Sequence, residues 1–190
     1  MRILVTAPYN EKERKVLETN FGEVIYRPWK PHGRAYTESE LMALLSETGA
    51  EALITEHDQV TSTVIEQNAG LQFIGVCRGT PSNVALETAR RKGIPVFHTP
   101  GRNAQAVAEM FIANVITLMR RTIPAWQWLQ EEKWEKGAHT SYLEFKGTEL
   151  AGKTIGMVGF GAVGQHIARL AKAFPCTIRF YDPYLESFDA

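Results

Sequence analysis

The sequence has little cysteine, no excess of charge of either sign and no long hydrophobic run. Its two cysteines, Cys77 and Cys176, lie far apart, and no C-x-x-C or His/Cys spacing suits zinc, so we expect no metal site and a reduced, cytoplasmic compartment.

Lysine with arginine totals 21, as does aspartate with glutamate, which gives no electrostatic reason to expect nucleic acid or an anionic membrane. No apolar run approaches the roughly 18 residues of a membrane span, and the N-terminus turns polar too soon for a signal peptide.

Short apolar runs alternate with amphipathic stretches along the first half of the chain. We expect strands at 2–6, 24–26, 52–55, 73–76 and 94–97. We expect helices between them at 11–19, 38–47, 61–67 and 83–92. Strands that alternate with helices imply a parallel sheet with helices on both faces. The sequence therefore predicts an α/β fold that begins with a flavodoxin-like, parallel-sheet domain over residues 1–100.

After a break at Pro100-Gly101, apolar residues recur at the three- and four-residue spacing of one long helix. They are Ala104, Val107, Ala108, Phe111, Ile112, Val115, Ile116 and Met119. Asn103 is a plausible N-cap, and Arg120 and Arg121 suit the negative C-terminal end. Most of the circumference is apolar, so we expect burial on more than one side. A helix between two domains would have this pattern, as would an ordinary core helix of one domain.

Residues 101–121 are therefore assigned to an interdomain helix and residues 122–150 to a connector. The connector carries three tryptophans, many charges and no long period, which predicts a connector with a short helix. No internal repeat or low-complexity tract is present in the sequence.

The sharpest motif begins after the connector. An expected strand over 153–158 runs into the turn Gly159-Phe160-Gly161-Ala162-Val163-Gly164, which is followed by a helix and a second strand over 177–181. In a dinucleotide-binding turn the first glycine allows the tight bend, the second lets a pyrophosphate approach the backbone amides, and the third lets helix and strand pack closely. The amides and the dipole at the helix N-terminus favour an anion.

Asp182 ends the second strand, close to where a carboxylate would accept hydrogen bonds from the ribose hydroxyls of an adenosine. A carboxylate there would repel a 2′-phosphate, so NAD is expected rather than NADP. The six residues of the turn, with Asp182 and Pro183, are the expected cofactor-binding residues. The alternative is a glycine-rich turn that binds no ligand.

Two segments resemble the D-isomer-specific 2-hydroxyacid dehydrogenase family, close to phosphoglycerate dehydrogenase. Residues 147–156, GTELAGKTIG, enter the turn as that family's G-x-E-L-x-G-K-T-x-G segment does. Residues 93–103, GIPVFHTPGRN, followed by VAE at 107–109, resemble its G-I-x-V-x-N-x-P-G-x-N…V-A-E segment, with His98 in place of the usual asparagine. The motifs occur in the right order, and the resemblance covers essentially the whole chain.

The resemblance implies a flavodoxin-like substrate domain and a Rossmann domain that transfer hydride between NAD(H) and a small 2-hydroxy or 2-oxo acid. The family's catalytic arginine and its histidine–carboxylate pair lie in the later Rossmann half. This chain ends at Ala190 after two strands of about six, so residues 151–190 would be an incomplete NAD-binding domain. No residue here is assigned a catalytic role, and we expect the truncated chain to be inactive alone. The interdomain helix would expose apolar surface and favour a homodimer.

The resemblance also places two loops at the substrate cleft. One is Thr55-Glu56-His57-Asp58, in which Glu56 and His57 are the candidate substrate residues, and the other is Cys77-Arg78-Gly79-Thr80, whose backbone amides bind the substrate carboxylate in the family. Gly79 would give access and Arg78 could add charge, although a solvated surface arginine is an equal alternative. The family usually reads G-A-G-x-D-N where this chain reads C-R-G-T-P-S-N, so the substrate can differ from phosphoglycerate. Asn103 and Val107 are assigned to the cofactor side, where capping and core packing explain them equally well.

Two other functions stay open at this point. One is a non-catalytic NAD(H)-binding regulatory or assembly module, which NADH binding without turnover would favour. The other is a receiver-like or flavin-binding domain with an additional βαβ arm. The loops after the early strands lack an acidic phosphoacceptor pocket and a hydroxyl-rich phosphate loop, which argues against the latter.

Overall fold

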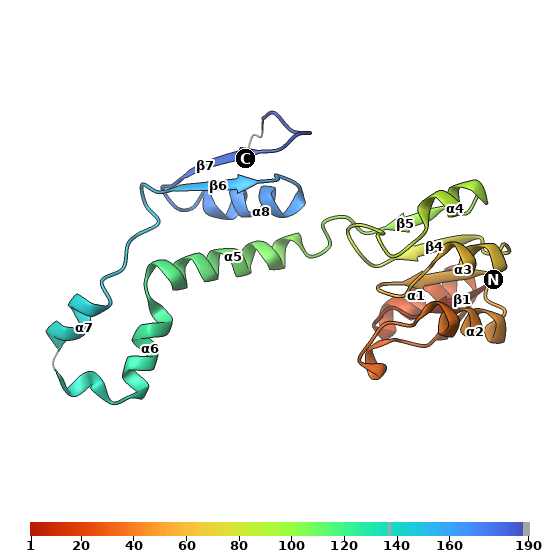
Figure 1. Cartoon of the computed structure of the whole chain (residues 1–190), viewed down its shortest axis with the longest axis horizontal. Coiled ribbons are helices and arrows are strands. Elements are labelled where there is room, and N and C mark those ends of the chain that lie inside the picture. Colours follow the sequence, from red (N-terminus) through yellow and green to blue (C-terminus); the bar gives the residue numbers. More distant parts are fainter. Residues whose placement is uncertain (137, 188–190) are drawn as a thin grey trace. The chain divides into compact units, whose positions relative to one another are not determined.

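A computed structural model describes residues 1–136 and 138–187, and the chain forms two compact units, Met1–Pro100 and Gly101–Ala190. The strands of the first unit are β1 (Arg2–Val5), β2 (Glu23–Tyr26), β3 (Ala52–Thr55), β4 (Phe73–Val76) and β5 (Val96–His98) (Figure 1). Its helices are α1 (Glu11–Phe21), the 3-10 turn η1 (Lys30–His32), α2 (Glu38–Thr48), α3 (Ser62–Gln67) and α4 (Leu86–Arg91).

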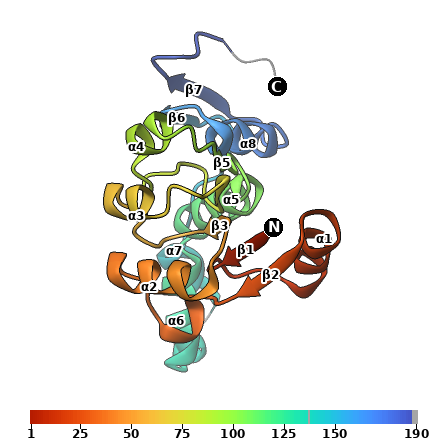
Figure 2. The same ribbon diagram turned by 90° about the vertical axis from the view of Figure 1, so that its right-hand side faces the viewer.

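The five strands of the first unit form one parallel sheet in the order β2-β1-β3-β4-β5. Its strand β1 pairs on both sides, with Leu4 opposite Ile25 on β2 and Leu53 on β3. Figure 2 shows α2, α3 and α4 along one face of the sheet and α1 on the other. The α/β architecture with a parallel sheet is therefore confirmed. In an open sheet of this order, ligands gather at the carboxyl ends of the strands, beside the point where the order reverses.

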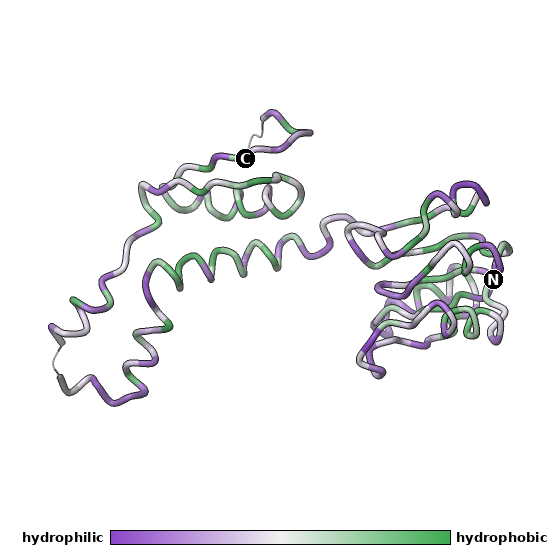
Figure 3. The backbone as a smooth tube through the Cα atoms, in the orientation of Figure 1, coloured by the Kyte–Doolittle hydropathy of each residue, from purple (hydrophilic) through white to green (hydrophobic). Residues whose placement is uncertain are grey.

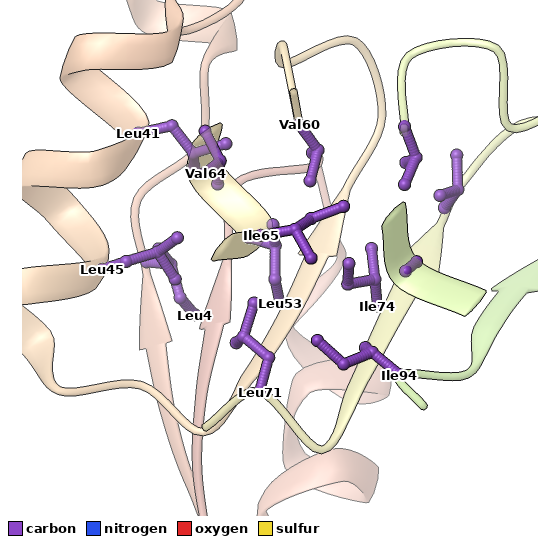
Figure 4. Packing of buried hydrophobic residues seen from close by; sticks show 13 residues of the cluster. Leu4, Leu41, Leu45, Leu53, Val60, Val64, Ile65, Leu71, Ile74 and Ile94 are labelled. Atoms are coloured by element: carbon purple, nitrogen blue, oxygen red, sulfur yellow. The ribbon is translucent and has the colours of Figure 1, made fainter. Parts of the chain in front are cut away.

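The core of the first unit lies between the sheet and helices α2 to α4. Apolar side chains on alternate strand positions point to this face and meet the apolar stripes of the helices. Figure 4 shows this packing for Leu4, Leu41, Leu45, Leu53, Val60, Val64, Ile65, Leu71, Ile74 and Ile94, all of them buried. Helix α2 is fixed at its start by a capping box between Thr37 and Glu40.

The second unit contains α5 (Ala104–Met119), α6 (Thr122–Gln130), η2 (Lys133–Lys136), α7 (Ala138–Glu144), β6 (Thr154–Val158), α8 (Ala162–Ala171) and β7 (Thr177–Tyr181). Strands β6 and β7 pair in parallel, and α8 connects them and packs against α5 (Figure 1). On both strands, half-buried residues alternate with exposed ones. Val158, for example, is 93% exposed. One face of this small sheet is therefore uncovered.

Two element boundaries in the first unit differ from the sequence prediction. Helix α4 begins at Leu86 rather than at residue 83, because Val84 pairs with Val60 in an isolated parallel bridge that holds this segment extended. Strand β5 begins at Val96 rather than at Ile94, although the Ile94 side chain is buried. Tertiary contacts determine where α4 and β5 begin, and such contacts cannot be predicted from sequence periodicity.

The connector is more helical than the sequence predicts, since it contains α6, η2 and α7. Trp128 is buried and makes edge-to-face contacts with Trp134 and Phe145, at ring-centroid distances of 6.0 and 5.6 Å. These aromatic contacts hold short helices together without any regular apolar period. The expectation of one short helix was therefore wrong.

Helix α5 covers the predicted apolar repeat from Ala104 to Met119 and is shorter than the assigned range of 101–121, and two expectations about it were wrong. The Asn103 side chain makes no capping hydrogen bond. Only Ala104 and Ala108 are buried, so the helix is not buried on more than one side. Its other apolar side chains include the exposed Met110 and Leu118, and Figure 3 shows hydrophobic residues along much of the helix. The expected exposure of apolar surface is confirmed.

No helix in the part of the chain that the structure describes combines the length and apolar character needed to span a bilayer. Within residues 1–136 and 138–187, no group of three or more histidine, cysteine, aspartate or glutamate side chains is arranged to hold a metal ion.

Candidate functional site

The glycine-rich turn connects β6 to α8 in a conformation that its first glycine makes possible. Gly159 has a φ of +87°, a region that favours glycine. Its amide donates to the carbonyl of Tyr181 over 2.8 Å, which ties the end of β6 to the end of β7. A Cβ built on Gly159 or on Gly161 would meet no atom within 4 Å. The space above the turn is therefore open to a ligand.

Three consecutive amides face this open space at the start of α8. Among the described residues, the N–H groups of Gly161, Ala162 and Val163 donate to no carbonyl or side chain. Unpartnered amides at a helix N-terminus, together with the helix dipole, form a binding site for an anion such as a pyrophosphate. The geometry of the turn thus fits the pyrophosphate of a dinucleotide.

Asp182 lies beside the turn, and its carboxylate is already oriented by the backbone. One oxygen accepts a hydrogen bond from the Phe160 amide over 2.6 Å, and the other accepts from the Tyr184 amide over 2.9 Å. These two bonds, the Phe160 bond first, hold the pKa of Asp182 below its ordinary value. A carboxylate has about four lone-pair sites, so ribose hydroxyls can still donate to it. Pro183 is exposed next to it.

The third glycine acts differently from the prediction. A Cβ on Gly164 would lie 3.2 Å from Cδ2 of Phe160 and 3.3 Å from the carbonyl oxygen of Gly159. Gly164 therefore makes room for the turn itself, whereas the sequence analysis attributed it to packing between helix and strand. The Phe160 ring is buried beneath the turn and stacks on Phe180.

The beginning of α5 lies close to this turn. A Cβ built on Gly101 would lie 3.1 Å from the Cβ of Ala162. Asn103 is exposed two residues after Gly101, and Val107 is 39% exposed one turn further on. Both residues are thus accessible from solvent on the helix that begins beside the turn.

In the first unit, the Glu56-His57 loop leaves the carboxyl end of β3. Nε2 of His57 lies 3.9 Å from a carboxylate oxygen of Glu56. The His57 ring also meets the Trp29 indole edge-to-face at a centroid distance of 5.4 Å. Trp29 follows β2, so residues from the ends of two strands meet here. The sequence analysis did not identify Trp29, which carries no motif.

The loop that follows β4, Cys77-Arg78-Gly79-Thr80, is held by its carbonyl groups. The Arg78 carbonyl accepts from the Thr99 amide over 2.9 Å, and the Gly79 carbonyl lies 2.9 Å from Nδ1 of His98. Over the described chain, the amides of Arg78, Gly79 and Thr80 have no backbone acceptor. Gly79 and Thr80 are exposed. This loop therefore also presents backbone N–H groups that an anionic ligand can use.

Cys77 has a structural position at the start of the same loop. Its amide donates to the Thr55 carbonyl over 2.8 Å, and its half-buried side chain lines a hollow of about 200 Å³ with Tyr9 and Phe97 among its other walls. Burial is the main cause that raises the pKa of Tyr9 above its ordinary value, followed by the charge of Cys77.

Asp58 ends the predicted cleft loop Thr55-Glu56-His57-Asp58, but the sequence did not predict that its side chain is buried. Its side chain is fully buried, and one oxygen accepts from the hydroxyls of Thr6 over 2.5 Å and Thr55 over 2.7 Å. Its other oxygen accepts from the Tyr36 amide over 2.8 Å. Asp58 therefore joins the carboxyl ends of β1 and β3 beneath the Glu56-His57 loop. Threonines at the ends of two adjacent parallel strands were the only signal in the sequence.

Comparison with known proteins agrees with the geometry of the turn. The family model described as "D-isomer specific 2-hydroxyacid dehydrogenase, NAD binding domain" matches residues 112–189. The chain is 58% identical over 186 residues to YoaD of Bacillus subtilis (strain 168), a protein named as a 2-hydroxyacid dehydrogenase; the match covers 98% of this chain and 54% of YoaD. It is 33% identical over 186 residues to the D-3-phosphoglycerate dehydrogenase of Methanocaldococcus jannaschii, which covers 97% of this chain and 33% of that enzyme.

The fold of the chain also matches a solved structure. The crystal structure of a protein from Thermus thermophilus superposes with a TM-score of 0.80 at 30% sequence identity, over 99% of this chain and 58% of that one. The chain thus spans about half the length of YoaD and of this crystallised protein. The matches to the family model and to YoaD argue against the alternative of a receiver-like or flavin-binding domain.

Proposed function

We propose that this chain, which belongs to the D-isomer-specific 2-hydroxyacid dehydrogenase family, provides the NAD(H)-binding turn and the substrate loops of an NAD-dependent 2-hydroxyacid dehydrogenase. Residues 1–100 are the flavodoxin-like substrate domain, and residues 101–121 are the interdomain helix. Residues 122–150 are the connector, and residues 151–190 belong to a Rossmann NAD-binding domain. We also propose a cytoplasmic protein that acts as a homodimer.

The observation that carries this proposal is the glycine-rich turn. It combines three amides that have no acceptor among the described residues, an open space above Gly159 and Gly161, and a carboxylate held at the end of the second strand. The amides of Gly161, Ala162 and Val163 would bind the pyrophosphate. The Asp182 carboxylate would accept from the ribose hydroxyls and would disfavour a 2′-phosphate.

Bound NAD would supply the hydride acceptor, and NADH the hydride donor, for the carbon that carries the hydroxyl or oxo group. The protein would bind and orient the two reactants. In the first unit, the amides of Gly79 and Thr80, which have no backbone acceptor among the described residues, support binding of a substrate carboxylate, and Arg78 would add a positive charge. Glu56 and His57 would line the neighbouring loop.

No described residue is assigned as the family's catalytic arginine, acid or histidine. We therefore expect the 190-residue chain to bind NADH but not to reduce a 2-oxo acid. The same result would suit a non-catalytic NAD(H)-binding module, so turnover has to be measured on the protein as it occurs in its native source.

A direct test uses isothermal titration of the 190-residue chain with NADH. Because a Cβ on Gly161 meets no protein atom within 4 Å, Gly161→Val is expected to fold and to fill the space that the pyrophosphate needs. We expect its NADH affinity to fall by about tenfold or more, because the pyrophosphate would lose at least one charge-assisted hydrogen bond. The matched control is Gly156→Ala on β6, which also meets no atom within 4 Å and lies outside the turn. Wild-type chain without NADH affinity, or a valine variant that binds normally, would contradict the proposal.

A further inference from the structure

Phe160 has an unusual environment for a residue at the tip of a turn. It is 1% exposed and is the largest side chain among the described residues that is buried to this extent. Its position in the motif allows many residue types, since only the glycines are specified. Burial of an aromatic ring directly beneath three exposed amides indicates that the ring supports the main chain of the turn.

The Phe160 ring is fixed to the second strand by stacking. Its centroid lies 4.0 Å from that of Phe180 on β7, with an interplanar angle of 14°. A Cβ on Gly164 would lie 3.2 Å from Cδ2 of Phe160, so the first turn of α8 closes over the ring from the other direction. Buried rings in such arrangements are held in place by packing and by their mutual stacking.

The main chain of Phe160 is fixed as well. Its amide donates to Oδ2 of Asp182 over 2.6 Å, and its carbonyl accepts from Nε2 of Gln165 over 3.2 Å. Phe180 and Asp182 are two residues apart at the end of β7. Phe160 therefore contacts this end twice, through its ring at Phe180 and through its amide at Asp182. A shift of the ring would therefore move the amide that orients the carboxylate.

We propose that Phe160 is a positioning residue of the nucleotide site: its ring, stacked on Phe180, sets the place of its own amide and thereby the orientation of the Asp182 carboxylate. This inference rests on the proposed function for the part that concerns nucleotide binding. It predicts that the ring governs the preference for NADH over NADPH, because the carboxylate is the group that disfavours the 2′-phosphate.

A merely structural role would have a different consequence. If the ring only filled space beneath α8, its loss would weaken all nucleotide binding equally and would leave the state of Asp182 unchanged. Phe174, a half-buried aromatic residue, lines a hollow of about 260 Å³ together with Phe160 and Phe180, but it joins no ring stack in the part of the chain that is described. Phe174→Ala therefore removes aromatic volume from the same region without removing the ring that stacks on Phe180.

The experiment compares Phe160→Ala and Phe174→Ala in the 190-residue chain by two measurements. Carbon-13 NMR follows the titration of the Asp182 carboxyl, and calorimetry gives the affinities for NADH and NADPH. For Phe160→Ala we expect the pKa of Asp182 to rise toward its ordinary value. We expect NADH affinity to fall by about tenfold, as for a weakened hydrogen bond to a charged group, and NADPH affinity to fall less. Phe174→Ala should leave the pKa and the ratio of affinities unchanged.

Phe160→Leu, which keeps apolar volume but cannot stack, replaces the alanine variant if the latter does not fold. An unchanged Asp182 titration and an unchanged NADH to NADPH ratio in the folded variant would overturn the role of Phe160. If wild-type chain binds neither nucleotide, the proposed function fails. The NMR titration needs no nucleotide, so it still reports whether the ring positions Asp182.

Discussion

The two units of this chain differ in how their candidate sites are built. In the first unit, a five-stranded sheet closes a buried core, and the site is assembled from the ends of several strands. In the second unit, a two-stranded sheet leaves one face exposed, yet its glycine-rich turn presents amides that fit an anion. A candidate anion site of this kind thus requires only one βαβ unit, whereas a stable core requires further layers of structure.

The range of the contacts explains this difference. Asp58 reaches Thr6, 52 positions away in the sequence, and Tyr36, 22 positions away. In the turn, the contacts of Phe160 with Phe180 and Asp182 stay within one βαβ unit. Because Asp58 depends on long-range contacts, the candidate site of the first unit should be sensitive to the global stability of that unit. The glycine-rich turn of the second unit should keep its conformation even when its core is weak.

The largest expected effect concerns the two cores. Leu53 is fully buried at the centre of the large sheet, whereas Ile155 on β6 is half-buried. Leu53→Ala should lower the free energy of unfolding of the first unit by about 4 kcal/mol, through lost burial and the cavity that remains. Ile155→Ala should lower that of the second unit by about 1 kcal/mol. Urea unfolding followed by hydrogen exchange of each unit measures both, and equal losses would contradict the comparison.

The buried carboxylate of the first unit gives the next largest effect. Asp58→Ala leaves the donors of Thr6, Thr55 and Tyr36 without their acceptor, which should lower the free energy of unfolding of this unit by about 3 kcal/mol. The control Glu47→Ala, at an exposed position of α2, should change it by less than about 0.5 kcal/mol. Nucleotide binding by the second unit should stay at its wild-type value in both variants. A loss of NADH affinity with Asp58→Ala would show that the two sites are coupled.

A close backbone approach in the second unit predicts a smaller loss. A Cβ on Gly147 would lie 2.5 Å from the carbonyl oxygen of Met119 and 2.8 Å from Cα of Arg120. Gly147→Ala should therefore force the connector away from the end of α5 and reduce the stability of this unit by about 2 kcal/mol. Gly156→Ala has no such neighbour and should be neutral or slightly stabilising. Thermal unfolding curves that rank the two variants in the opposite order would refute this interpretation.

The same contrast between local and long-range contacts explains what the sequence could predict. The strands, most helices and the parallel sheet followed from apolar periodicity, and the position of the turn, with Asp182 beside it, followed from glycine spacing. Both signals are local. The start of α4 at Leu86 was missed because it depends on the pairing of Val84 with Val60.

Long-range contacts also account for the other omissions. The helices of the connector depend on the aromatic contacts of Trp128, and the role of Asp58 depends on the ends of two strands. The burial of Phe160 was missed because a turn position normally indicates exposure. Its partner Phe180 is identified only once the two strands are paired.

The smallest expected effect is the pH dependence of the turn. The amides of Phe160 and Tyr184 stabilise the ionised form of Asp182, so its pKa in the folded chain lies below the ordinary value that the unfolded chain has. The stabilisation is therefore fully present above the unfolded pKa and is lost as the pH falls through the folded pKa. We expect the NMR shift of the Phe160 amide to titrate with the same midpoint as the Asp182 carboxyl, and to lose this titration in Asp182→Asn. Because solvent reaches this pair, overall stability should change little. A midpoint at or above the ordinary aspartate value would mean that the amides do not hold the carboxylate in solution.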